Sequence, residues 1–177
     1  MGFPFHKNIF LLGWILMIFK GYFLGGTVEA TTLEDVCRMS YDQHLCLNDF
    51  GPSMKTAPIP TLANLAIRKV IDNMNMTRIT IEFLLYFSVD PKDHDILNYC
   101  KNSYGPPFSS LVASAYYNMK HGQYRRLGQQ AVAAFNAADR CQDAYAAYFL
   151  KARFQSYMND LKRMSYILHV IVNEFLL

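Results

Sequence analysis

The residues best suited to chemistry in this sequence are four cysteines, Cys37, Cys46, Cys100 and Cys141. No CxxC pair occurs and no histidine lies at a ligand spacing from a cysteine, so the pattern does not favour a zinc site. An even number of cysteines in an oxidising compartment favours two disulfides instead. Four cysteines allow three pairings, and the sequence alone does not choose among them.

Residues for catalysis are not gathered in any known motif. The sequence contains no GxSxG, no HExxH and no glycine-rich phosphate loop. Asp90, Asp93 and Asp95 crowd one expected helix start, where unpaired amides and the helix dipole favour carboxylates. The histidines are isolated from one another: His6, His44, His94, His121 and His169. We therefore predict no enzyme activity, no metal and no cofactor.

The first thirty residues have the pattern of a secretory signal peptide. A short basic start, His6-Lys7, precedes the apolar run Ile9–Phe19, and Val28–Ala30 offers small residues at the two positions that a signal peptidase inspects. The apolar run ends at Lys20 and is shorter than the roughly 20 residues that cross a bilayer. We predict cleavage after Ala30 and a secreted chain with no membrane anchor.

Composition and charge limit the remaining possibilities. Of 177 residues, 52% are apolar and 18% charged, which excludes a disordered or collagen-like chain. The length suits one domain. The net charge of +3 comes from scattered basic residues rather than a basic segment, so we expect no nucleic-acid binding. We expect a monomer.

Helical periodicity is persistent after residue 30 and no stretch of strict alternation suggests a sheet, so the predicted fold class is all-α. The segment from Leu33 to about Phe50 holds two short helical stretches around Ser40-Tyr41-Asp42, which Cys37 and Cys46 could join. Pro58-Ile59-Pro60 then marks a boundary, because proline denies helix continuation. We predict an N-terminal helical hairpin over 31–60.

Residues 61–177 are expected to form an up-and-down four-helix bundle. Gly105-Pro106-Pro107 interrupts the second helix, where we expect a kink or two shorter pieces. The four helices are expected from Thr61, as N-cap, to about Ser88; from near Lys92 to Met119; from the end of the Lys120–Gln123 turn to Tyr148; and from about Ala152 to Leu176.

Each of these helices carries an apolar seam with steps of three and four residues, as a bundle requires. Cys100 and Cys141 fall on two of the seams and should face the core. Asn75, one step past Met74, should face outward, so the sequon Asn75-Met76-Thr77 is a predicted glycosylation site. The seams are Ala63, Ile67, Val70, Met74, Ile81 and Leu84; Leu97, Cys100, Tyr104, Phe108, Leu111, Ala115 and Met119; Leu127, Ala131, Ala134, Ala138, Cys141, Tyr145 and Tyr148; and Leu161, Met164, Leu168, Ile171 and Phe175.

Several short motifs occur in order along this helical frame. They are Cys37-Arg-Met-Ser-Tyr-Asp-Gln-His-Leu-Cys46, Leu62-Ala-Asn-Leu-Ala66, Ser88-Val-Asp-Pro91, Leu97-Asn-Tyr-Cys100 with Tyr104 following, Gly122-Gln-Tyr124, and Ala131-Val-Ala-Ala-Phe-Asn-Ala-Ala-Asp-Arg-Cys141. With them the sequence resembles the plant invertase and pectin methylesterase inhibitor family, nearest to small secreted members described as invertase inhibitors. The resemblance covers essentially the whole chain after residue 30.

The resemblance implies disulfides Cys37 to Cys46 and Cys100 to Cys141, and a non-catalytic inhibitor that docks on a cell-wall carbohydrate enzyme in the apoplast. Members that block pectin methylesterase use the outer faces of bundle helices. A sugar on Asn75 would obstruct one such face. The corresponding candidates for contact are Arg68, Asn75 and Arg78 on the first bundle helix, and Asn118, Lys120 and His121 near the end of the second.

Members that block acid invertase are similar to one another in a Pro-Lys-Phe tripeptide at the turn between the second and third bundle helices. Here the aligned residues are Gly122-Gln123-Tyr124, which lack the proline and the lysine. Contacts of this kind would come from His121, Gln123, Tyr124 and Arg125. We therefore predict an inhibitor of pectin methylesterase, with inhibition of acid invertase, or a non-inhibitory structural role, as alternatives.

Overall fold

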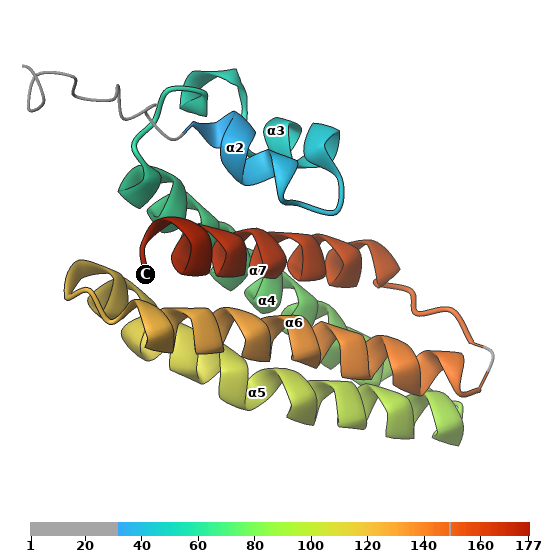
Figure 1. Ribbon diagram of the computed structural model, residues 1–177. Helices are drawn as coiled ribbons and strands as arrows, with labels where there is room; N and C mark the ends of the chain where they lie inside the picture. Colours follow the sequence, from blue (N-terminus) through green and yellow to red (C-terminus); the bar gives the residue numbers. More distant parts are fainter. Residues whose placement is uncertain (1–31, 149) are drawn as a thin grey trace, which may run out of the picture. The chain divides into compact units, whose positions relative to one another are not determined.

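The structure of the chain is a computed structural model that describes residues 32–148 and 150–177 (Figure 1). The expected signal peptide and its cleavage site after Ala30 lie outside these residues. Every regular element in the described part of the chain is a helix, which confirms the all-α fold class. None of these helices is long and apolar enough to cross a bilayer.

Within residues 32–177, as far as the structure describes them, four long helices follow two short ones and a single 3-10 turn. In the bundle, α4 packs beside α5 and α7, and α6 packs beside α5 and α7, so α4 and α6 occupy diagonal positions. This arrangement confirms the four-helix bundle with an N-terminal hairpin. The elements are α2 (Leu33–Arg38), α3 (Gln43–Phe50), η1 (Pro52–Met54), α4 (Ile59–Phe87), α5 (Pro91–Lys120), α6 (Tyr124–Ala146) and α7 (Gln155–Phe175).

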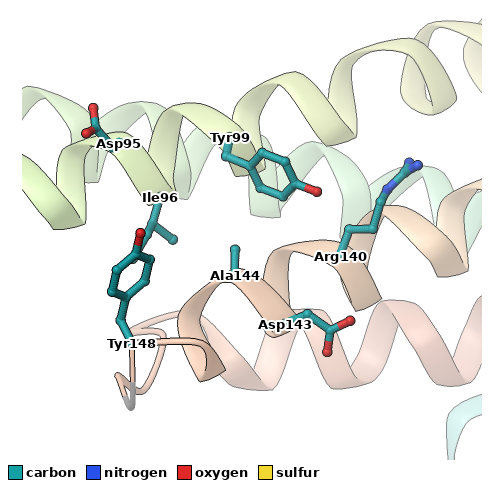
Figure 2. Close-up of a pocket in the computed structure, with 7 residues that line it drawn as sticks. All are labelled: Asp95, Ile96, Tyr99, Arg140, Asp143, Ala144 and Tyr148. Atoms are coloured by element: carbon teal, nitrogen blue, oxygen red, sulfur yellow. The ribbon is translucent and has the colours of Figure 1, made fainter.

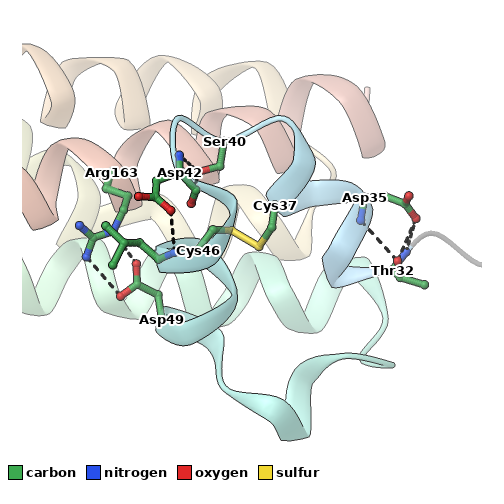
Figure 3. Close-up of a disulfide and its surroundings, with 9 residues drawn as sticks. Thr32, Asp35, Cys37, Ser40, Asp42, Cys46, Asp49 and Arg163 are labelled. Atoms are coloured by element: carbon green, nitrogen blue, oxygen red, sulfur yellow. Dashed lines mark hydrogen bonds and ion pairs between the residues drawn. A yellow bond between two sulfur atoms is a disulfide. The ribbon is translucent and has the colours of Figure 1, made fainter.

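The two hairpin helices are too short to be stable alone and are fixed at their starts by side-chain caps. Thr32 and Asp35 form a capping box at α2, in which each side chain accepts a hydrogen bond from the backbone N–H of the other residue. The Asp42 carboxylate accepts the N–H of Leu45 at 2.9 Å and caps α3. A disulfide between Cys37 and Cys46 joins the two helices, as the resemblance implies (Figure 3).

The hairpin is attached to the last bundle helix by an ion pair and an aromatic contact. The guanidinium of Arg163 on α7 donates to the Asp49 carboxylate at 2.6 Å and to Asp160 at 2.9 Å. The hydrogen bond to Asp49 raises the pKa of Arg163. Tyr41 stacks on Tyr166 with ring centroids 4.1 Å apart. These contacts attach the hairpin to α7, and Figure 3 shows the pair of Asp49 and Arg163.

The bundle core is built from the predicted seams. Nearly all of the seam residues are buried, and Thr77, the only polar position in the first seam, is also buried and donates its hydroxyl to the Asn73 carbonyl at 2.7 Å. Phe108 and Phe175 are partly buried against the core. Cys100 and Cys141 are fully buried and form the second disulfide, which links α5 to α6.

Three predicted helix limits are wrong. Helix α4 begins at Ile59, two residues before Thr61, because Pro60 is tolerated in a first helical turn. Helix α7 begins at Gln155 rather than Ala152. Tyr148 was expected in the third seam, but α6 ends at Ala146 and the Tyr148 side chain is 54% exposed.

Of the kink or two shorter pieces expected in the second helix, the two pieces are wrong, because α5 is one helix from Pro91 to Lys120 with Pro106 and Pro107 inside it. The prolines remove the helical donors for the carbonyls of Asn102 and Ser103. Both of these residues are at least partly exposed, so water can satisfy the carbonyls. Packing of the buried side chains on either side keeps the helix continuous.

The two disulfides should contribute unequally to stability. The chain separation is 41 residues for Cys100 and Cys141 but 9 for Cys37 and Cys46. Loop-closure entropy then predicts losses of about 4 kcal/mol for Cys100→Ala/Cys141→Ala and about 2.5 kcal/mol for Cys37→Ala/Cys46→Ala. Urea unfolding of the two double variants checks the order, and a larger loss for the hairpin variant would contradict it.

The capping box should respond to acid. The backbone and side-chain hydrogen bonds from Thr32 lower the pKa of Asp35 below its ordinary 3.8. Its contribution to stability is therefore present above the ordinary value and is lost as the pH falls through the lowered pKa. Carbon NMR titration of the Asp35 carboxyl should show a midpoint below 3.8 that rises in Thr32→Ala. Equal midpoints in the two proteins would mean that the box does not form.

Candidate functional site

The described residues form a groove between α5 and α6, made of three hollows that share lining residues. Figure 2 shows the first hollow, with Ile96 and Ala144 between the helices, Tyr148 beside Ile96 and Tyr99 extended toward Arg140. Tyr99 and Arg140 also line the second hollow. We call this surface the α5–α6 groove.

The far part of the groove leads from the two helix prolines to the turn between α5 and α6. Ser110 and Ala133 line both the second and the third hollow, which makes the groove continuous. The third hollow extends to Tyr117, Gln123 and Arg126. The groove therefore runs along most of both helices.

Side chains along the groove are aromatic and charged. The Asp95 and Asp143 carboxylates lie with Arg140 in the first hollow, whereas Arg126 is the charged residue of the third. Lys92 also lies over the Tyr148 ring, 6.0 Å from its centroid, so the Tyr148 end carries charges of both signs, whereas the turn end is basic. Exposed tyrosines together with arginines are characteristic of protein-binding surfaces.

A buried amide pair forms the floor of the third hollow. The Asn118 side-chain amide on α5 donates to Gln130 Oε1 on α6 at 3.0 Å. The Gln130 amide in turn donates to the carbonyl and hydroxyl of Ser110 and to the hydroxyl of Ser114, at 2.8 to 2.9 Å. Such a network fixes the register of two helices because a shift would leave buried amides unpaired.

This network corrects one predicted contact residue. Asn118 was expected on the outer surface, but its side chain is only 3% exposed. It lies on the side of α5 that faces α6, where an amide is tolerated because Gln130 pairs with it. Neither Gln130 nor the groove residues Tyr99 and Arg140 were recognised from the sequence. The only sequence signal for this site was the group of polar residues around Met119, where the second seam ends.

The three candidates on α4 do not reach the groove. Arg68 and Asn75 are exposed. The Arg78 guanidinium lies 4.5 Å from the centroid of the Phe108 ring, so it packs across the α4–α5 boundary. Thr77 of the sequon is fully buried, which means that the complete sequon is accessible only before α4 packs into the bundle.

Candidates at the turn between α5 and α6 lie at the basic end of the groove. His121 is exposed and stacks on Tyr117 with centroids 3.9 Å apart. Gln123 lines the third hollow, and its Oε1 accepts a hydrogen bond from Arg126 at 3.1 Å. Tyr124 is half-buried against the core. Lys120 and Arg125 are exposed.

The carboxylates at the start of α5 have separate roles. Asp90 caps the helix by accepting the N–H of Lys92 at 2.9 Å, as expected. Asp93 instead accepts hydrogen bonds from the Tyr145 hydroxyl and from Arg153. Burial, and then the Asp93 carboxylate, raise the pKa of the Tyr145 hydroxyl. Asp93 therefore connects the ends of α5 and α6 to the segment that leads into α7.

Comparison with known proteins gives a match in structure but not in sequence. No protein-family model and no curated protein matches this chain. A crystal structure of a mutant form of a pectin methylesterase inhibitor from Arabidopsis superposes with a TM-score of 0.73 at 18% identity. The match covers 80% of this chain and 95% of that one.

A second solved structure, a pectin methylesterase inhibitor from Arabidopsis thaliana, superposes with a TM-score of 0.61 at 20% identity over 82% of this chain and 95% of that one. The chain has the fold of the pectin methylesterase inhibitors. Because the sequence identities are low, the two structures support only the fold that the resemblance implied. They carry no information about invertase.

The amide pair under the groove should matter for stability. Asn118→Ala leaves Gln130 Oε1 buried without its donor, so it should cost about 1–3 kcal/mol. Gln129→Ala, at the exposed neighbouring position on the groove rim, is the matched control and should change stability by less than about 0.5 kcal/mol. Urea unfolding measures both, and equal effects would show that the pair adds nothing.

Proposed function

We propose that the chain is a secreted, non-enzymatic protein that binds and blocks a plant cell-wall pectin methylesterase in the apoplast. The observation that supports the proposal best is the fold shared with two pectin methylesterase inhibitors over 95% of their chains. The signal-peptide pattern and two buried disulfides agree with an extracellular site of action.

The α5–α6 groove is the surface that we assign to enzyme contact. Its walls are already joined by the Cys100–Cys141 disulfide and by the Asn118–Gln130 pair, so little ordering is needed on docking. Pre-organisation of this kind increases affinity because less conformational entropy is lost. Tyr99, Tyr117 and Tyr148 are each close to half exposed or more, and offer large contact areas with few rotatable bonds.

This assignment removes a conflict posed by the sequon. A sugar on Asn75 would cover the outer face of α4, which was one candidate surface for the enzyme. Helix α4 lies diagonally across the bundle from α6. A glycosylated Asn75 therefore leaves the α6 wall of the groove accessible.

Inhibition of acid invertase gains no support from the turn. A contact like that of the Pro-Lys-Phe tripeptide would need a side chain that projects from residues 121–125. Arg125 is exposed, but Gln123 and Tyr124, which align with the lysine and phenylalanine of the tripeptide, are both partly buried, and Tyr124 packs against the core. We therefore retain pectin methylesterase as the proposed target.

The function is tested by methanol release from pectin, using a panel of plant pectin methylesterases over a broad pH range. Wild-type protein should inhibit at least one of them. Arg140→Glu reverses a charge inside the groove and should raise the inhibition constant about tenfold or more, as expected for an arginine at the centre of an interface.

Arg68→Glu is the control, because it makes the same charge change at an exposed position on α4. It should leave the inhibition constant within about twofold. An effect of Arg68→Glu without one of Arg140→Glu would transfer the contact to α4. A sucrose-hydrolysis assay with acid invertase runs in parallel, and inhibition there alone would contradict the proposed target.

A further inference from the structure

Helix α4 carries a second apolar stripe on the side that faces away from the bundle core. Its members are Met76, Ile79, Phe83 and Tyr86, at steps of three, four and three residues, with exposures of 45%, 51%, 62% and 84%. Such spacing is the pattern of a helix that packs against another helix. The core seam of α4 already accounts for its contacts with α5 and α7, so this stripe has no partner among the described residues.

The exposed area is large for a monomer. Phe87 and Val89, 59% and 97% exposed, extend the stripe beyond its last turn. Taking about 150–250 Å² for a fully exposed aromatic side chain, the six residues together expose on the order of 700 Å². The largest apolar patch of a typical monomer is about 300–600 Å². A standard interface buries about 800 Å² on each partner, which the stripe and its margins can supply.

The chemistry of the stripe argues against a charged partner or a membrane. Glu82 is the only charged residue between Arg78 and Asp90. Helices that lie on membranes combine an apolar face with free lysine and arginine flanks. The one arginine within the span of this stripe, Arg78, is instead paired with Glu82 at 3.8 Å and packs on the Phe108 ring. Homodimer interfaces are more apolar than those of transient complexes, and an entirely apolar stripe fits that class.

We propose that the stripe binds a second copy of this chain, with the two α4 helices antiparallel. The spacings between stripe residues, three, four and three positions, are the same counted from either end of the helix. In an antiparallel dimer, Met76 of each copy therefore lies opposite Tyr86 of the other, and Ile79 of each copy lies opposite Phe83 of the other. The two-fold axis crosses the helices at the level of residue 81. A two-fold interface requires this kind of reciprocal pairing.

The dimer differs from the monomer expected from the sequence, in which only the core seam of this helix was recognised. It is compatible with the proposed inhibitor, because α4 lies diagonally opposite α6 and the dimer leaves the α6 wall of each groove open. Asn75 precedes the first stripe residue, so a sugar there would crowd the edge of the interface. The dimer is therefore expected for protein without that sugar.

The test is sedimentation velocity of the chain, produced in a secretory host and treated to remove N-linked sugar, at concentrations up to about 100 µM. The wild type should sediment as a dimer. Ile79→Glu should weaken dimerisation about tenfold or more, since it places two charges in an apolar interface. Val112→Glu on α5 is the matched control, because Val112 is 53% exposed against 51% for Ile79, and it should have no effect.

A second pair of variants tests the antiparallel pairing. Ile79→Lys and Phe83→Glu should each be monomeric alone. When the two variants are mixed, a heterodimer should form, because the new lysine of one copy lies opposite the new glutamate of the other. The second pair of the heterodimer keeps its native Ile79 and Phe83. Melting curves that match the wild type show that each variant is folded.

A monomeric wild type, or a dimer unaffected by Ile79→Glu, would overturn the proposal. Loss of pectin methylesterase inhibition in Ile79→Glu, with a monomeric wild type, would mean that the stripe contacts the enzyme instead, and self-association would be wrong. Monomeric single variants that fail to recombine would exclude the antiparallel pairing.

Discussion

The attachment of α5 to α6 is the constraint on which the proposed function depends. A disulfide between two fully buried cysteines holds the helices together at one level, and a buried amide pair fixes their register nearer the turn. Between these points the groove walls have little freedom to move. A rigid wall suits a protein that acts by obstruction, because its binding energy is not consumed in ordering its own surface.

Much of the fold could be predicted from the sequence. The seams identified four helices, and the inward positions of Cys100 and Cys141 were correct because helical periodicity is strong over long segments. The errors lie where local rules compete with packing. Proline chemistry predicted a kink or two shorter pieces in the second helix, but buried side chains on both sides of Pro106 and Pro107 keep α5 in one piece. Helix ends such as Ile59 depend on capping details that periodicity does not contain.

The site was less accessible to sequence reasoning. Asn118 was predicted on an outer helix face because the family resemblance implies contacts there, whereas its burial depends on Gln130, a residue on another helix. The groove itself arises from pairs such as Tyr99 and Arg140, which are 41 positions apart in the sequence. The stripe on α4 was visible in the sequence as apolar residues between the seam positions, but only the bundle shows which face is left uncovered.

The proposed inhibition requires a target enzyme to contact the α5–α6 groove. Hydrogen–deuterium exchange of the chain with and without an inhibited pectin methylesterase measures this directly. Exchange in the complex is expected to be slower over the groove-facing parts of α5 and α6 and at the turn between them, with α4 unchanged. Slower exchange confined to α4, with the groove unaffected, would contradict the proposed contact.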